Sequence, residues 1–169
     1  MRARHDRGTF SLDPALDFLR LLWAVEHGLQ RASKRMEATL GVTGPQRLVL
    51  RVVGRFPGVS AGELARIVLL HPSTITGIVQ RLVSRSLLLR ERDPEDSRRV
   101  RLRLAPRALT FTRVSRGTVE RAVTRALGRT KASDVRAAQE VLSAVADAVH
   151  EINEPDSKRA TRRPARRTT

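Results

Sequence analysis

The sequence HPSTITGIVQRLVSR, residues 71–85, predicts an amphipathic helix. Its apolar residues recur at the spacing of a helix that packs one side on a core, and they are Ile75, Ile78, Val79, Leu82 and Val83. Because successive residues turn by about 100°, the opposite face can also be predicted. That face carries small and polar residues, namely Ser73, Gly77, Gln80 and Ser84, with Thr74 and Arg81 at its edges.

Two further helices are expected before this segment, and each begins with a capping box. In this motif an N-cap hydroxyl and a Glu or Gln three residues later satisfy backbone N–H groups. Thr43 and Gln46 open the first helix, which runs to about Phe56, and Ser60 and Glu63 open the second. The side chains of the second helix expected to face inward are Leu64, Ile67 and Val68. With the 71–85 helix, the second helix forms a helix-turn-helix.

A β-hairpin is expected directly after the helix-turn-helix. Leu87 to Glu91 is a candidate strand, Asp93-Pro-Glu-Asp96 has strong turn residues, and Arg99 to Leu104 alternates in polarity. The alternation points three apolar side chains to the core, Val100, Leu102 and Leu104, and three arginines away from it, Arg99, Arg101 and Arg103. The expected fold is therefore mainly α with a small β-hairpin wing.

Longer helices flank the winged helix-turn-helix. The first apolar-periodic helix extends from about Asp13 to Leu40. Helix resumes at Pro106 and is expected to continue without a break to about Leu127, and a last helix covers Ala132 to Ile152. Residues 153–169 are rich in arginine and poor in apolar residues, which predicts a disordered basic tail.

The composition favours duplex DNA as the partner. The 169 residues include 33 Lys and Arg against 17 Asp and Glu, a formal charge of +16, which indicates nucleic acid or an anionic membrane surface. Aromatic residues make up only 3%, too few to build stacking platforms for single-stranded nucleic acid. No stretch reaches the roughly 18 apolar residues of a membrane span, and residues 1–11 lack an apolar signal segment. We expect a cytoplasmic protein without a membrane partner.

The sequence also argues against an enzyme or a metalloprotein. It has no cysteine, which excludes disulfides, thiolate nucleophiles and zinc sites with Cys ligands. Its histidines are scattered, and a pair such as Glu26 and His27 points to different helix faces. Neither a phosphate-binding glycine loop nor a convincing acid–base pair is present. We expect no catalytic residue, no cofactor and no bound metal.

The outer face of the 71–85 helix is the candidate surface for reading bases. Small and polar side chains let a helix backbone approach base edges in the major groove. Gln80 can pair bidentately with adenine, whereas Arg81 suits both guanine and phosphate, and the sequence does not decide between them. The residues predicted to bind DNA are Ser73, Thr74, Thr76, Gly77, Gln80 and Arg81 in this helix, and Asp96, Arg98 and Arg99 in the wing. The alternative is helix packing for Gly77, a turn residue that bonds its own backbone for Asp96, and an ordinary solvated surface for the others. The arrangement of helix, turn, helix and wing favours DNA.

These motifs, taken in order, resemble the MarR family of bacterial transcriptional regulators. They lie within about residues 12–150 and read Leu40-Gly-Val-Thr-Gly-Pro-Gln46, Gly62-Glu-Leu-Ala65, Pro72-Ser-Thr-Ile-Thr76, Arg81-Leu82 and Asp93-Pro-Glu-Asp-Ser-Arg-Arg99. The resemblance implies a homodimer that binds palindromic operators and is usually a repressor released by small ligands. It also implies that Asp96 holds Arg98 and that Arg98 enters the minor groove. A narrow minor groove attracts arginine because it concentrates negative potential.

The resemblance assigns a role to each part of the chain. It implies an N-terminal dimerisation helix at 12–41, a winged helix-turn-helix DNA-binding region at 43–105 and C-terminal dimerisation helices at 106–152. Trp23 is then interpreted as part of a dimer core rather than as a pocket wall. The basic tail is open to three interpretations: a specific DNA-binding arm, a nonspecific electrostatic contact or a solubilising segment. An architectural DNA-binding protein of low specificity is the alternative for the whole chain.

Four positions depart from the family pattern. Leu69 stands where a turn Gly is usual, His71 where a capping Asp is usual, Ser86 where a helix-ending Gly is usual, and Ala105 where a capping Thr is usual. Each is expected to lose a local cap or a freely adopted φ angle, so a recognition helix that is slightly strained or differently angled is predicted.

Overall fold

The structure is a computed structural model that describes residues 12–96, 98–113 and 117–153. The chain divides into two compact units, residues 1–122 and 123–169. The predicted basic tail lies outside the described residues except for Asn153. Among the helices in the described ranges, none is long and apolar enough to cross a membrane.

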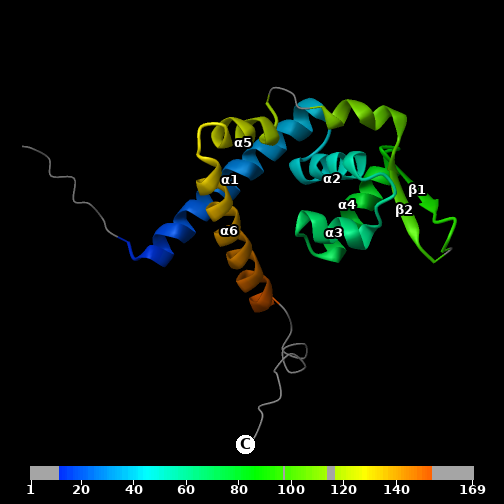
Figure 1. The fold of residues 1–169 in the computed structure, drawn as a ribbon. Helices are drawn as coiled ribbons and strands as arrows, with labels where there is room; N and C mark the ends of the chain where they lie inside the picture. The colour runs from blue at the N-terminus through cyan, green and yellow to red at the C-terminus, as the bar shows by residue number, and fades with distance from the viewer. Residues whose placement is uncertain (1–11, 97, 114–116, 154–169) are drawn as a thin grey trace, which may run out of the picture. The chain divides into compact units, whose positions relative to one another are not determined.

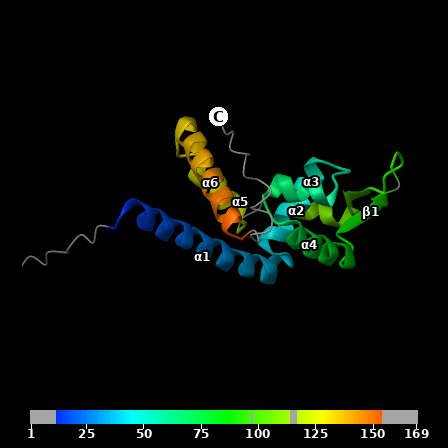
Figure 2. The same ribbon diagram turned by 90° about the horizontal axis from the view of Figure 1, so that it is seen from below.

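The elements follow the predicted order of helices and strands (Figure 1). They are α1 (Pro14–Leu40), α2 (Gly44–Arg55), α3 (Ala61–Val68), α4 (Pro72–Ser84), β1 (Leu88–Arg92), β2 (Val100–Leu104), η1 (Pro106–Thr112), α5 (Val119–Leu127) and α6 (Ala132–Asn153). The chain is thus mainly α with one antiparallel two-stranded hairpin, as predicted. Figure 2 shows α2, α3 and α4 gathered at the base of this hairpin.

Both predicted capping boxes are present. The Thr43 hydroxyl accepts a hydrogen bond from the Gln46 N–H at 3.3 Å, and the Gln46 side chain accepts one from the Thr43 N–H at 3.1 Å. Ser60 and Glu63 make the same exchange at 3.3 and 2.9 Å. The backbone N–H of Ser60, followed by its hydroxyl, lowers the pKa of Glu63 below its usual value by bonding to the ionised carboxylate. These contacts are local, so the sequence was sufficient to predict them.

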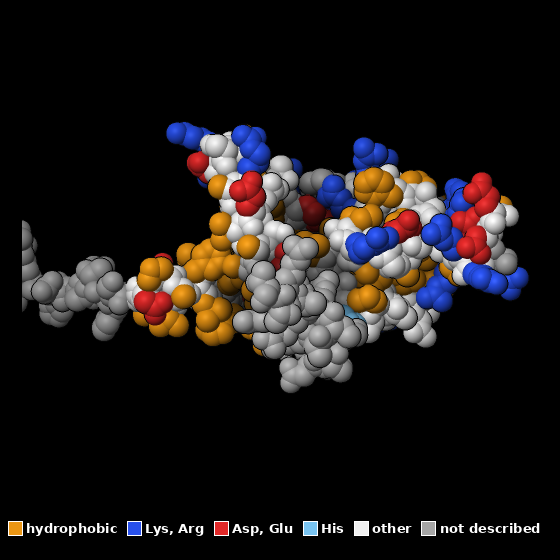
Figure 3. All heavy atoms as spheres, turned by 60° about the horizontal axis from the view of Figure 1, so that its bottom comes forward, with side chains coloured by type: hydrophobic (Ala, Val, Ile, Leu, Met, Phe, Trp, Pro, Cys, Tyr) orange, Lys and Arg blue, Asp and Glu red, His pale blue; other side chains and the backbone are white. Residues whose placement is uncertain are grey.

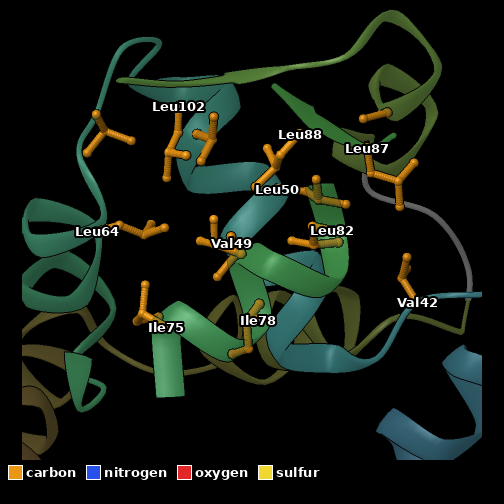
Figure 4. Close-up of a cluster of buried hydrophobic side chains, with 14 of the residues drawn as sticks. Val42, Val49, Leu50, Leu64, Ile75, Ile78, Leu82, Leu87, Leu88 and Leu102 are labelled. Carbon is orange, nitrogen blue, oxygen red and sulfur yellow. The ribbon is translucent and has the colours of Figure 1, made fainter. Parts of the chain in front are cut away.

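One hydrophobic core joins α2, α3, α4 and the hairpin (Figure 4). The predicted stripe of α4 supplies Ile75, Ile78, Val79 and Leu82, all of them buried. Across from it lie Leu50 of α2 and Leu64 of α3, and the strands close the core with further leucines. Burying each such side chain is worth about 2 kcal/mol. This packing orients α4, because rotating the helix would expose its apolar stripe.

The hairpin is fixed to the helices along β2. β1 and β2 are in antiparallel register from Leu88 opposite Leu104 to Arg92 opposite Val100. On its other edge, β2 exchanges backbone hydrogen bonds with the loop before α3, from Gly58 N–H to Leu102 C=O at 2.9 Å and from Leu102 N–H to Val59 C=O at 3.0 Å. Pairing on both edges holds the base of the wing against the helix-turn-helix.

Gly54 allows the strand to pack closely on α2. A Cβ atom at this position would lie 2.9 Å from Leu104 Cδ1 and 3.3 Å from Thr112 Cγ2. Both atoms belong to side chains, so a Cβ atom here would require the end of the Leu104 side chain to shift. Gly54 thus lets the Leu104 side chain lie directly against α2.

The prediction of one unbroken helix from Pro106 to Leu127 is wrong. Residues Pro106–Thr112 form a 3₁₀ helix, Arg113 is extended at φ −76° and ψ 136°, and α5 begins only at Val119. Gly117 adopts φ +80°, in the left-handed region that a helix cannot continue through. A tertiary contact accompanies the break, because the buried Arg47 side chain donates a hydrogen bond to the Arg113 carbonyl.

Two side chains predicted to face the core are instead exposed. Ile67 in α3 is 47% exposed and Val100 in β2 is 44% exposed. α3 has only two turns, and its buried side is occupied by Leu64 and Ala65. Val100 lies opposite Arg92, where the hairpin extends beyond the helices that cover its base. Periodicity predicted the side of each element correctly, but it did not predict how far the core extends.

The predicted loss of free φ angles is confirmed at two positions, and the predicted loss of a cap at one. Leu69 and Ser86 both adopt φ +54°, a left-handed conformation that costs a non-glycine residue about 1–2 kcal/mol. Ala105 makes no side-chain cap for η1. At His71 the prediction is wrong, because its Nδ1 accepts the Ser73 N–H at 3.3 Å and so caps α4.

Replacing Leu69 by glycine should stabilise the protein. The Leu69 side chain is 73% exposed, so its removal loses little burial, while the strain at φ +54° is relieved. After allowance for the greater freedom of glycine in the unfolded chain, we expect the free energy of unfolding to rise by about 0.5–1 kcal/mol. Urea denaturation measures the change. Ile67→Gly, in the helical backbone of α3, is the control and should lose about 1 kcal/mol; a loss with Leu69→Gly as well would contradict the assignment of strain.

Candidate nucleic-acid interface

The predicted outer face of α4 lies at the surface. Ser73, Thr74, Thr76, Gln80 and Arg81 are exposed, and Gly77 is half-buried among them. The buried stripe on the other side of the helix holds them there, because each residue about 180° from a core residue must face away from the core. The structure therefore brings all six predicted helix residues onto one accessible surface.

Several groups on this face are already partly engaged. The Thr76 hydroxyl donates to the Pro72 carbonyl at 2.9 Å, which leaves its oxygen lone pairs and its methyl group exposed. The Ser73 hydroxyl lies 2.7 Å from His71 Nδ1. Among the hydrogen bonds formed by the described residues, none uses the Gln80 side chain. The Gln80 amide can thus offer both its donor and its acceptor to a partner.

The Arg81 side chain folds back toward the N-terminus of α4. Its Nε donates to the Gly77 carbonyl at 3.2 Å, one turn toward the N-terminus of α4. A Cβ atom at Gly77 would have only one neighbour within 4 Å, the Arg81 Nη2 at 3.7 Å. Gly77 is therefore not a helix-packing residue, which agrees with the prediction that it lies opposite the apolar stripe.

At the tip of the wing, Asp96 organises the turn. Its Oδ1 accepts the backbone N–H of Arg98 at 3.0 Å, and its Oδ2 lies 4.0 Å from Arg99 Nε. The contact of Asp96 with Arg98 is thus made through the backbone, and the ion pair that Asp96 forms is with Arg99. Both arginine side chains are exposed. The turn fixes the backbone of Arg98 and leaves its guanidinium at the surface.

Sequence reasoning missed the ion pairs that brace the wing. Asp93 is buried at the base of the turn, where it accepts the Glu95 N–H at 2.9 Å and Arg101 Nε at 2.7 Å. The backbone N–H of Glu95 and then Arg101 lower the pKa of Asp93 below its usual value, against the opposing effect of burial. Arg103 pairs with Glu91 at 2.8 Å. Arg101 and Arg103, which were predicted to point away from the core, thus each neutralise a carboxylate of the wing.

A second missed feature is a buried arginine in α2. Arg47 is 1% exposed, and its Nε donates to Glu120 of α5 at 2.9 Å, while its guanidinium also binds the Arg113 carbonyl. Arg51, one turn further, lies 3.6 Å from the same carboxylate. The only sequence signal was that Arg47 is three residues from Leu50 and so lies beside the apolar stripe.

An extensive apolar surface runs along α1, shown in orange in Figure 3. Its exposed members are Leu16, Leu19, Leu21, Trp23, Val25 and Leu29, with Trp23 at 62% exposure. Within the second unit, α6 likewise exposes Val141, Leu142, Val149 and Ile152. Contiguous apolar surface on a monomer marks an interaction site. α6 thus presents one apolar face, and α1 exposes apolar side chains on two opposite sides, both suited to burial against another protein chain.

The first unit also contains a cavity of about 810 Å³. Its walls come from the second half of α1, the start of α2, the turn before α4 and the start of α5. Leu29, Met36 and Leu70 make part of the lining apolar, and Lys34 and Glu120 add opposite charges. The volume falls in the range of small-molecule sites.

Comparison with known proteins identifies the family of this chain. Residues 40–99 match the model of the MarR family. The chain is similar to the PcaV transcriptional regulator from Streptomyces coelicolor, whose crystal structure is in complex with its natural ligand. The two sequences are 30% identical, and the structures align with a TM-score of 0.65 over 82% of this chain and 98% of PcaV. The chain belongs to the MarR family. The predicted resemblance and fold class are confirmed, and the protein is assigned to a family of transcription regulators.

Two further structures show the MarR fold bound to DNA. The S. aureus MepR–DNA complex is 15% identical, with a TM-score of 0.64 over 78% of this chain and 97% of that one. Streptococcus pneumoniae FabT in complex with DNA is 14% identical, with a TM-score of 0.60 over 83% and 100%. At these identities the likeness to this MarR-family chain concerns the fold alone. No curated protein sequence matches the chain.

Proposed function

We propose that this protein is a repressor that binds a pseudo-palindromic operator as a homodimer. In this proposal residues 43–105 bind DNA, with α4 in the major groove and the wing beside it. Residues 12–41 and 106–152 form the dimer interface. The single observation that carries the proposal is the accessible polar face of α4, held outward by its buried apolar stripe. Duplex DNA admits a helix of this kind in its major groove.

Charge and the wing support the same partner. The formal charge of +16 favours a polyanion, and phosphate contacts by arginine supply affinity that falls steeply with salt. At the wing tip, Arg98 carries a guanidinium that no ion pair among the described residues neutralises. MarR-family structures in complex with DNA support this use of the fold.

The homodimer is supported by the apolar faces of α1 and α6. Water-exposed faces of this size are costly unless a partner covers them, and a second copy of the chain is the simplest partner. Two copies place two α4 helices on one duplex, about 34 Å apart on successive turns. Sedimentation equilibrium should then give about twice the 18.9 kDa of the chain.

A small-molecule effector is proposed for the cavity beside α1. The cavity touches the turn before α4, so an occupant could change the position of that helix. The structure of PcaV, a relative of this chain, contains that protein's natural ligand. This likeness supports a small-molecule effector for the present chain. Release from DNA on addition of candidate compounds, measured by fluorescence anisotropy, tests the proposal.

Replacing Gln80 by alanine should weaken binding to the preferred site selectively. Sites are first selected from a random duplex pool with the wild-type protein. Because a bidentate base contact is worth about 1–3 kcal/mol, we expect roughly 10-fold weaker binding to the selected site and unchanged binding to a shuffled duplex. Gln139→Ala, which removes an exposed amide from α6 outside residues 43–105, is the control, and sedimentation equilibrium checks that this variant still dimerises. An equal loss on both duplexes would argue against base reading by Gln80.

The competing function is an architectural protein that coats DNA with little sequence preference. The high positive charge and the arginine-rich C-terminal sequence favour it. The ratio of specific to nonspecific affinity separates the two functions. A regulator should bind its site at least about 10³-fold more tightly than random duplex at physiological salt. A smaller ratio would favour the architectural function.

A further inference from the structure

We infer that Arg81, seated over Gly77, reads a guanine in each half-site of the operator rather than a phosphate. The inference rests on the proposed function, and it concerns one specificity-determining contact on the α4 surface. The sequence left Arg81 open to either partner, because arginine binds both. The side-chain geometry now distinguishes them.

The Arg81 side chain points back along α4. Side chains in a helix lean toward its N-terminus, and the Nε donor of Arg81 reaches the Gly77 carbonyl at 3.2 Å. Arg81 begins at the edge of the polar face, from which an extended arginine would reach toward the phosphates at the rim of the groove. The bond to Gly77 instead keeps the guanidinium over the middle of the face. Base edges lie opposite that position when a helix enters the major groove.

Gly77 leaves space for the Arg81 guanidinium. The position of an absent Cβ lies 3.7 Å from Arg81 Nη2, so the flat guanidinium rests on bare backbone. An alanine methyl group would just touch the guanidinium, and a longer side chain would displace it. Gly77 thus acts as a positioning residue for Arg81.

The bond to Gly77 leaves most of the Arg81 donors available. A guanidinium has one N–H on Nε and two on each terminal nitrogen. The Gly77 carbonyl takes the Nε donor, which leaves the fork of Nη1 and Nη2 for a partner. That fork matches the O6 and N7 acceptors of guanine in a bidentate pair. Among the ion pairs formed by the described residues, none includes Arg81, so no carboxylate competes for it.

Arg85 provides an internal comparison. It lies one turn after Arg81 and is also exposed, but its Nη2 is directed to Gly41, 3.4 Å from the position of the absent Cβ there. The two arginines therefore diverge, and only Arg81 lies over the polar face of α4. Arg85→Lys is the matched control for a substitution that keeps the charge and removes the fork.

The experiment compares sequences selected from a random duplex pool by full-length wild type, Arg81→Lys, Gly77→Leu and Arg85→Lys. Lysine keeps the charge but lacks the planar fork. We expect the wild-type motif to contain a G·C pair in each half-site that Arg81→Lys and Gly77→Leu no longer select. Arg85→Lys should leave the motif intact. On the wild-type site, Arg81→Lys should bind on the order of 10- to 100-fold more weakly, with unchanged affinity for random duplex.

Two results would overturn the inference while leaving the proposed function in place. One is an Arg81→Lys motif identical to that of the wild type. The other is a phosphate signature, in which Arg81→Ala weakens every duplex equally and lowers the salt dependence by about one released counterion. A wild-type protein that selects no motif would instead remove the proposed function together with the inference. Circular dichroism melting of each variant confirms that it is folded.

Discussion

Replacing Arg47 by methionine should lower the free energy of unfolding by about 3 kcal/mol. Arg47 is almost fully buried, and its guanidinium binds both the Glu120 carboxylate of α5 and the Arg113 carbonyl. Methionine keeps much of the volume but leaves the carboxylate without its closest cation and the carbonyl without its donor. Breaking a buried pair by removing one partner is costly for this reason. Urea denaturation at one fixed protein concentration measures the loss, because dimer formation would add to the apparent stability.

Arg51→Met is the control for this substitution. Arg51 points to the same Glu120 carboxylate at 3.6 Å, but its side chain is about one-third exposed. A partly solvated pair at that distance contributes little, so we expect a loss below about 1 kcal/mol. Equal urea midpoints for wild type and Arg47→Met would mean that the buried contacts of Arg47 contribute no net stability.

A large effect on DNA binding is expected for Arg98→Ala. Asp96 holds the backbone of Arg98 at the wing tip and leaves its guanidinium exposed, and a narrow A·T-rich minor groove attracts such a group. A charge-assisted contact is worth about 1.5–3 kcal/mol. We therefore expect roughly 10- to 100-fold weaker binding to an operator with A·T-rich flanks, and a much smaller loss when the flanks are G·C-rich. Anisotropy titrations with the two flanks on one core sequence measure the difference.

Arg103→Ala tests whether any wing arginine would have the same effect. Arg103 is exposed but paired with Glu91 at 2.8 Å, so its charge is already compensated. Removing the Arg103 side chain should change the affinity for DNA only slightly, because surface ion pairs contribute little. The change should not depend on the flanking sequence. If Arg98→Ala lost the same affinity with both flanks, Arg98 would be a phosphate contact rather than a minor-groove residue.

Most of the candidate site could be predicted because its determinants are local. The spacing of Ile75, Ile78 and Leu82 selects the face of α4 that is buried, and the opposite face follows from helix geometry. Turn residues predicted the wing in the same way. The contact between Arg81 and Gly77 spans a single helical turn, yet the sequence alone did not predict it. A side chain with several rotamers can bond to several partners, and only the three-dimensional surroundings select one.

Short-range chemistry was enough to predict the order of the elements as far as β2, both capping boxes, the polar face of α4 and the hairpin. Contacts between distant residues decided the rest. Arg47 and Glu120 are 73 positions apart, and the break between η1 and α5 accompanies a hydrogen bond from the same buried arginine. The ion pair of Asp93 with Arg101 likewise depends on strand register. Periodicity and caps express the interactions of residues within a few positions, whereas burial of a charge depends on which remote groups the folded chain brings to it.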